Sequence, residues 1–201
     1  DNIRKLKLLS KTQLENELGI KFNVKNLLIT FHPVTLEPNT SKKHMNELIE
    51  ALVLLDNTNF IFTMPNSDTH SRIIFDIINE FVSKNSHSKV FTSLGRLKYL
   101  SCIKYCDGVI GNSSSGIIEA PALKIPTINI GSRQRGRTQS SSIINCENEI
   151  SAISQAISEI PSIDRSLISN PYDEGNTSEN IVNILEEIDF NFSLRKEFID
   201  I

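Results

Sequence analysis

The segment from Gly108 to Leu123 constrains the fold and the chemistry of this chain more than any other. Gly108-Val109-Ile110 predicts a short buried strand, Gly111-Asn112-Ser113-Ser114-Ser115-Gly116 is a run of small residues, and Ile117 to Leu123 predicts a helix. A helix that begins directly after a strand presents backbone N–H groups without intrahelical partners, at the positive end of its dipole. Small side chains let a phosphate approach these groups. Because a serine that only caps a helix gives the same pattern, the segment by itself leaves phosphate binding and capping open.

Apolar strands and amphipathic helices alternate along the rest of the chain with short connections. Strands are predicted at residues 27–31, 60–64, 90–92, 109–110, 127–130 and 142–145. Helices are predicted at residues 45–55, 73–82, 97–105, 117–123, 150–160 and 178–188. The strands are apolar on both faces, as strands buried within a parallel sheet are. The pattern therefore predicts an α/β fold with a doubly wound, mostly parallel, Rossmann-like sheet.

The chain does not begin with Met, and a helical spacing of apolar residues from Ile3 to Leu18 is already under way near its first residue. We expect a fragment of a longer chain. Residues 1–22 are predicted to be a lead-in helix that follows an N-terminal domain, residues 23–190 to be the α/β domain, and residues 191–201 to be a C-terminal tail.

Composition narrows the possible partners. The chain has 201 residues and a net charge of −3 with no basic block, which argues against nucleic acid as the main partner. No apolar run is long enough to cross a membrane. The three cysteines have no metal-ligand spacing and are typical of reduced thiols. We therefore expect a cytoplasmic protein with no metal site and with neither nucleic acid nor a membrane as its partner.

The predicted strand order places two distant segments together. In the common order 3-2-1-4-5-6, strands 1 and 4 are neighbours, and ligands bind outside their carboxyl ends. His32 follows the first predicted strand and Ser113 follows the fourth. If this order applies, both residues open into one crevice, which favours a phosphate site. His32 would then donate a hydrogen bond to phosphate, although a lone histidine is more often a structural residue.

Other candidate residues also follow strands. Glu119 lies one helical turn past Ser115, where a carboxylate either interacts with the helix dipole or accepts hydrogen bonds from ribose hydroxyls. Arg133 begins a set of three alternating arginines that forms either a solvated loop or a clamp on a pyrophosphate. Asn66 and Leu94 follow the second and third strands, where a turn or cap role is the simpler interpretation.

Taken together, these motifs resemble the UDP-N-acetylglucosamine 2-epimerases, in particular the hydrolysing branch that serves sialic acid synthesis. The motifs lie in the expected order between about residues 25 and 190. The resemblance rests on Thr30-Phe31-His32-Pro33-Val34-Thr35, Pro65-Asn66-Ser67-Asp68, the run from Gly111 to Gly116 with Glu119, the run from Ile130 to Arg137, and Gly175-Asn176-Thr177-Ser178.

This resemblance implies the C-terminal half of a two-domain enzyme of the glycosyltransferase-B type, in which two Rossmann-like halves face a cleft. It implies that His32, Ser113, Ser114 and Arg133 hold the pyrophosphate of UDP and that Glu119 holds the ribose. Leu94 would meet uracil through its backbone, and Asn66 would line the nucleotide site. The family's catalytic carboxylates belong to the other half, so the resemblance implies no catalytic residue in this chain.

The implied reaction is loss of UDP from UDP-GlcNAc by elimination, followed by hydration of the glycal to N-acetylmannosamine. UDP and UDP-GlcNAc are the implied ligands, no cofactor is implied, and the full-length protein is expected to be a dimer or tetramer. Ser115 replaces a cysteine or glycine of relatives, which is a change between small residues. Two other functions stay open: the donor-binding domain of a glycosyltransferase, and a non-catalytic binding module.

Overall fold

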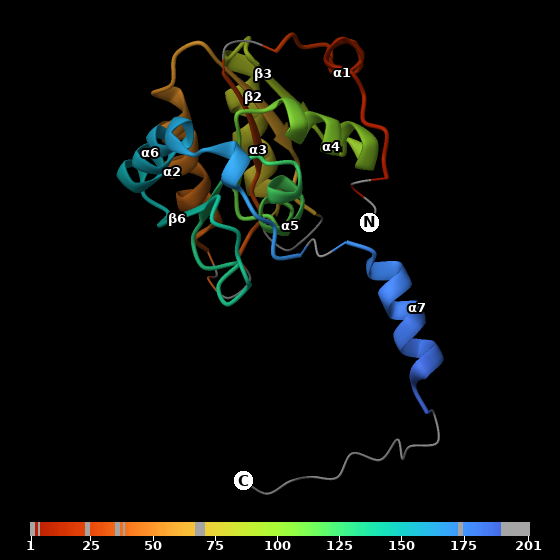
Figure 1. The fold of residues 1–201 in the computed structure, drawn as a ribbon. Coiled ribbons are helices and arrows are strands. Elements are labelled where there is room, and N and C mark those ends of the chain that lie inside the picture. Colours follow the sequence, from red (N-terminus) through yellow and green to blue (C-terminus); the bar gives the residue numbers. More distant parts are fainter. Residues whose placement is uncertain are drawn as a thin grey trace, which may run out of the picture.

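The computed structural model describes residues 3, 5–22, 25–34, 37, 39–66, 71–172 and 175–189. Their core is a six-stranded parallel sheet with the order β3-β2-β1-β4-β5-β6 (Figure 1). The predicted fold class and the predicted strand order are therefore confirmed. The strands are β1 Lys25–Thr30, β2 Thr58–Thr63, β3 Ser88–Phe91, β4 Gly108–Gly111, β5 Thr127–Ile130 and β6 Ile143–Cys146.

Helices cover both faces of this sheet. They are α1 Lys11–Leu18, α2 Ser41–Val53, α3 Ser71–Lys84, α4 Gly95–Tyr105, α5 Ser114–Ala122, α6 Ile150–Glu159 and α7 Thr177–Glu187, with 3-10 turns η1 Ile160–Ser162 and η2 Arg165–Leu167. Several helices begin before the first apolar residue that periodicity identifies, because their first turns consist of polar or small residues. Within the described ranges, no helix combines the length and the apolar character that a membrane span needs.

The sheet separates two hydrophobic cores, one on each of its faces. Leu27 and Ile29 of β1 pack with α2, α3 and α6 on one face of the sheet. Leu28, between them in sequence, packs with α1 and α4 on the other face. Because successive side chains of a strand point to opposite faces, a strand that is apolar throughout needs helices on both sides.

The N-terminal helix is shorter than its apolar spacing predicts. α1 begins at Lys11, because Ser10 and Gln13 form a capping box in which each side chain pairs with the other's backbone N–H. Residues 5–10 are not helical, so the predicted helix from Ile3 was wrong there. Their apolar side chains instead pack against the α4 side of the sheet, and the Leu9 N–H donates to Ser101 Oγ at 3.0 Å.

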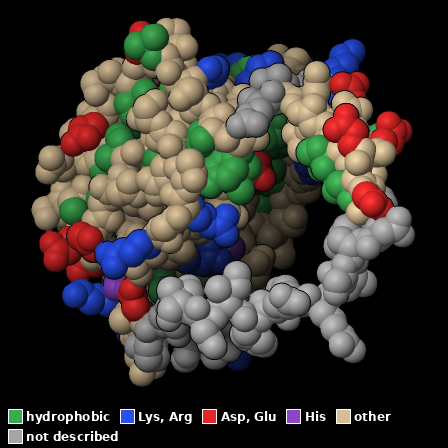
Figure 2. Space-filling model, turned by 60° about the horizontal axis from the view of Figure 1, so that its bottom comes forward, with side chains coloured by type: hydrophobic (Ala, Val, Ile, Leu, Met, Phe, Trp, Pro, Cys, Tyr) green, Lys and Arg blue, Asp and Glu red, His purple; other side chains and the backbone are tan. Residues whose placement is uncertain are grey.

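The α7 helix confirms the last predicted helix but lies apart from the sheet and its covering helices (Figure 1). None of its residues is buried. Figure 2 shows its apolar side chains exposed beside acidic ones. The predicted division into residues 1–22, 23–190 and 191–201 stays a prediction, and the tail lies outside the described residues.

Candidate functional site

A glycine makes the sharp turn between β4 and α5. Gly111 has a φ of +138° and is paired with Thr30 in the neighbouring strand β1. A Cβ atom on Gly111 would lie 2.0 Å from the Thr30 carbonyl oxygen. Only glycine fits this close approach, and the turn carries the chain directly into the serine-rich segment.

The next residue joins the ends of β1 and β4. Asn112 is fully buried, and its side-chain oxygen accepts from the His32 N–H at 2.7 Å. Its amide nitrogen donates to the His32 carbonyl at 2.8 Å. This pair of bonds fixes two segments that are 80 positions apart in the chain. His32 and Ser113 consequently line the same cavity, as the strand order predicted.

Ser113 caps the helix that follows. Its Oγ accepts from the Ser115 N–H at 3.4 Å, and α5 begins at Ser114. The capping interpretation of the sequence is thus confirmed. The cap leaves phosphate binding open as well, because one side-chain oxygen satisfies only one of the N–H groups that a helix start leaves without a partner.

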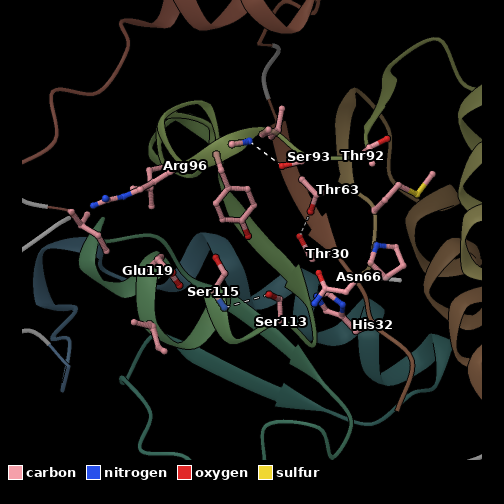
Figure 3. A pocket seen from close by; sticks show the side chains of 18 of the residues that line it. Thr30, His32, Thr63, Asn66, Thr92, Ser93, Arg96, Ser113, Ser115 and Glu119 are labelled. Atoms are coloured by element: carbon pink, nitrogen blue, oxygen red, sulfur yellow. Dashed lines mark hydrogen bonds between the residues drawn. The ribbon is translucent and has the colours of Figure 1, made fainter. Parts of the chain in front are cut away.

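A cavity of about 970 Å³ lies at the carboxyl ends of β1, β2, β3 and β4, and α4 and α5 supply part of its wall. Figure 3 shows Ser115 and Glu119 from α5 on one side of it, with Ser113 and His32 close by at the strand ends. Of the residues predicted to form the site, five line this cavity: His32, Asn66, Leu94, Ser113 and Glu119. Ser114 and Arg133 are not among its lining residues.

Arg133 instead contacts the turn before α5. Its guanidinium donates to the Asn112 carbonyl at 3.0 Å. The Gln134 side chain donates to the same carbonyl at 2.7 Å and is buried. Periodicity and composition do not identify Gln134, because it lies in a polar loop between two arginines and only the folded chain brings it to Asn112.

Several residues of the cavity were missed by sequence reasoning. Thr30 and Thr63 end the paired strands β1 and β2, and their hydroxyls share a hydrogen bond in the cavity wall (Figure 3). Tyr99 and Arg96 come from α4, and Ser115 comes from the second position of α5. The two strand-terminal threonines could have been found from the repeated pattern of three apolar residues and a threonine, whereas Tyr99 and Arg96 carry no signal in a helix of mixed composition.

A half-buried carboxylate is the main titratable feature of the cavity wall. Burial raises the pKa of Glu119, and the Ser115 hydroxyl partly opposes this shift. One Glu119 carboxylate oxygen is buried and has no hydrogen-bond partner in the described chain. A buried acceptor of this kind is rare in a folded protein unless a water molecule or a ligand completes it. The cavity wall can therefore accept a hydrogen bond from a ligand at Glu119.

We expect replacement of Glu119 by glutamine to stabilise the chain without ligand at neutral pH. Because the folded-state pKa of Glu119 lies above the unfolded value, folding favours the protonated form. Its stabilisation is complete below the unfolded pKa and is lost as the pH rises through the folded pKa. Glu119→Gln should therefore raise the melting temperature at neutral pH and change it little at about pH 3. Thermal unfolding followed by circular dichroism at both pH values tests this, and a lower melting temperature at neutral pH would contradict it.

Comparisons with known proteins agree with this arrangement. A family model described as UDP-N-acetylglucosamine 2-epimerase matches residues 1–186. The chain is 41% identical over 161 residues to a Campylobacter jejuni protein named GDP/UDP-N,N'-diacetylbacillosamine 2-epimerase (hydrolyzing). This alignment covers 80% of this chain and 41% of that protein. It is 38% identical over 207 residues to polysialic acid biosynthesis protein P7 of Escherichia coli, which covers 100% of this chain and 51% of that protein.

A solved structure shows the same fold. The UDP-GlcNAc 2-epimerase of Methanocaldococcus jannaschii in complex with UDP-GlcNAc and UDP superposes with a TM-score of 0.68 at 19% identity, over 92% of this chain and 50% of that chain. The chain spans about half the length of the curated relatives it matches. Because the family model matches most of its residues, this chain belongs to the UDP-N-acetylglucosamine 2-epimerase family.

Proposed function

We propose that this chain is the nucleotide-binding half of a hydrolysing UDP-GlcNAc 2-epimerase. The observation that supports the proposal is one cavity lined by Ser113 at the start of α5, by His32 after β1 and by Glu119, one of whose carboxylate oxygens is buried. A helix start favours phosphate groups, and a carboxylate one turn further along accepts hydroxyl groups. A nucleoside diphosphate carries these two kinds of group next to each other.

The proposed contacts follow the shape of UDP. The pyrophosphate binds at Ser113 with His32 beside it in the cavity. Ser114 and Arg133 do not line the cavity, and we propose that they reach the pyrophosphate from the first position of α5 and from the Asn112 carbonyl. The ribose hydroxyls bind Glu119. Two residues form the base end of the site: Leu94, which precedes α4, and Asn66, which follows β2.

In the proposed reaction, the C1–O bond of UDP-GlcNAc breaks, a proton leaves C2, and UDP departs with the bonding electrons. Water then adds to the resulting glycal and yields N-acetylmannosamine. The contribution of this chain is electrostatic. N–H groups of α5, His32 and Arg133 stabilise the negative charge that grows on the departing pyrophosphate. The groups that move the C2 proton belong to the other half of the enzyme.

The name of one relative supports a role in sialic acid synthesis. One relative is named for diacetylbacillosamine and another for polysialic acid. The proposed contacts of this chain reach only the nucleotide, so a change of amino sugar would alter residues of the other half. UDP-GlcNAc is the substrate we propose, with a homo-oligomer as the working form of the complete protein.

Binding of UDP to the chain tests the proposal. Isothermal titration calorimetry is expected to detect UDP, and Ser113→Ala should weaken the affinity about ten- to a hundredfold, because a hydrogen bond to a charged group contributes about 1.5–3 kcal/mol. Ser83→Ala is the matched control, since the Ser83 hydroxyl donates to Glu80 on the exposed side of α3, outside the cavity. Equal affinities of the unchanged chain and Ser113→Ala would contradict the proposed pyrophosphate site.

Turnover is measured on a protein that carries both halves. We expect UDP-GlcNAc alone to yield UDP and free N-acetylmannosamine, and the 201-residue chain to yield neither. A requirement for an acceptor sugar would instead assign the protein to the glycosyltransferases that share this architecture.

A further inference from the structure

Three polar side chains meet at one wall of the cavity without a complete set of hydrogen bonds. Ser115 and Glu119 lie one turn apart on α5 (Figure 3), and Tyr99 reaches the same wall from α4. The Tyr99 hydroxyl, the Ser115 hydroxyl and one Glu119 oxygen are all buried, and no contact of theirs within the described chain has full hydrogen-bond geometry. Three such atoms together are more than packing alone explains, because native proteins satisfy most buried polar groups.

The chemistry of the three groups allows an order of donation that satisfies all of them. An ionised carboxylate only accepts, a serine hydroxyl donates once while accepting, and a phenol donates readily. Small rotations of the two hydroxyls therefore let Tyr99 donate to Ser115 and Ser115 donate to one oxygen of Glu119. Ser115 lies close to both neighbours. Burial raises the pKa of Tyr99 and of Glu119, and the Ser115 hydroxyl lowers each of them, as the Thr30 hydroxyl also does for Tyr99.

This order of donation leaves the second oxygen of Glu119 for a ligand. We propose that Tyr99 is a positioning residue that acts through Ser115 to hold the Glu119 carboxylate toward the vicinal hydroxyls of a nucleoside, and so sets a preference for ribonucleoside over 2'-deoxyribonucleoside diphosphates. The proposal rests on the proposed function, which supplies the nucleotide. A carboxylate held at one oxygen by a hydroxyl keeps its orientation, whereas a carboxylate without that partner turns freely between rotamers and loses part of its discrimination.

The Tyr99 hydroxyl can be removed with little other change. Tyr99→Phe keeps the aromatic ring in the wall, and Ser115→Ala keeps the helix. The matched control is Tyr105→Phe on the same helix, because the Tyr105 hydroxyl donates to the Leu9 carbonyl at 3.2 Å and does not line the cavity. Each variant and the unchanged chain are titrated with UDP and with 2'-deoxyuridine diphosphate, and the ratio of the two dissociation constants is compared.

The unchanged chain is expected to bind UDP about tenfold more tightly than the deoxy compound, as one hydrogen bond to a carboxylate predicts. Tyr99→Phe and Ser115→Ala should each lower this ratio by about threefold, mainly by weakening UDP. The double variant should lower it no further than the stronger single variant, because the two residues act in series. Tyr105→Phe should leave the ratio unchanged.

The outcomes separate the two proposals. UDP binding with the same ratio in Tyr99→Phe and the unchanged chain would overturn this inference and leave the proposed function standing. Effects of the two substitutions that add in the double variant would also overturn it, since they would mean that Tyr99 does not act through Ser115. Absence of UDP binding by the unchanged chain would overturn the proposed function and this inference together.

Discussion

Gly111→Ala is expected to lower the free energy of unfolding by at least about 3 kcal/mol, the upper range for a residue forced into a strained backbone region. The φ of +138° at Gly111 belongs to a region that side chains with a Cβ rarely adopt, and the added Cβ would lie 2.0 Å from the Thr30 carbonyl oxygen. Relief of this contact requires β1 and β4 to separate at the centre of the sheet. Urea unfolding measures the loss, and we expect the variant to bind no UDP even where it still folds.

A glycine with open space around it is the matched control for Gly111. Gly19 ends α1 in the left-handed region with a φ of +62°, and an added Cβ there would meet no atom within 4 Å. Gly19→Ala should therefore cost only the conformational strain, about 1 kcal/mol. If both substitutions cost the same, the close approach of β1 and β4 at Gly111 would not be the reason for the glycine.

Asn112→Ala is expected to cost about 2–6 kcal/mol of unfolding free energy, because it leaves two buried backbone groups without partners at about 1–3 kcal/mol each. The Asn112 amide pairs with both the N–H and the carbonyl of His32. Its loss frees the end of β1 from the turn before α5, so UDP affinity should fall together with stability. Urea unfolding and calorimetry with UDP measure the two effects separately.

Two further substitutions make the Asn112 prediction specific. Asn112→Asp keeps the acceptor but removes the donor, and it places a charge at a fully buried position, so it should be at least as destabilising as alanine. Asn145→Ala removes an amide at the exposed edge strand β6, where its partners are Asn129 and Gln139, and should cost about 1 kcal/mol. A cost at Asn112 no larger than at Asn145 would show that the joint between β1 and β4 contributes little.

Sequence periodicity predicted the sheet well because the central strands contain short runs that are apolar on both faces, such as Leu27-Leu28-Ile29 in β1 and Phe60-Ile61-Phe62 in β2. The same reasoning was wrong for the segment before α1. There, apolar residues at helical spacing join the core that includes α4 without forming a helix, while the polar capping box at Ser10 and Gln13 decides where the helix begins. Apolar spacing indicates which side chains are buried. Whether their backbone is helical depends here on local hydrogen bonds, such as those of the capping box.

Some residues of the candidate site could likewise be predicted from the sequence, and others could not. His32, Ser113 and Glu119 were predictable because each follows a strand or begins a helix, and parallel strands bring their carboxyl ends to one edge of the sheet. Tyr99 and Gln134 were not predictable, because their roles depend on which side of α4 or of a polar loop faces the site. Arg133, predicted beside a bound pyrophosphate, donates to the Asn112 carbonyl in the folded chain.

By itself, the sequence determined the alternation of strands and helices, which predicts a parallel sheet, and the small-residue turn after β4, since these depend on residues close together in the chain. Only the tertiary structure decided that Asn112 joins β1 to β4 and that Tyr99 comes to Ser115 and Glu119. The physical reason is that hydrogen bonds and burial act through space. Contacts between residues that are distant in the chain exist only after the sheet and its covering helices have assembled.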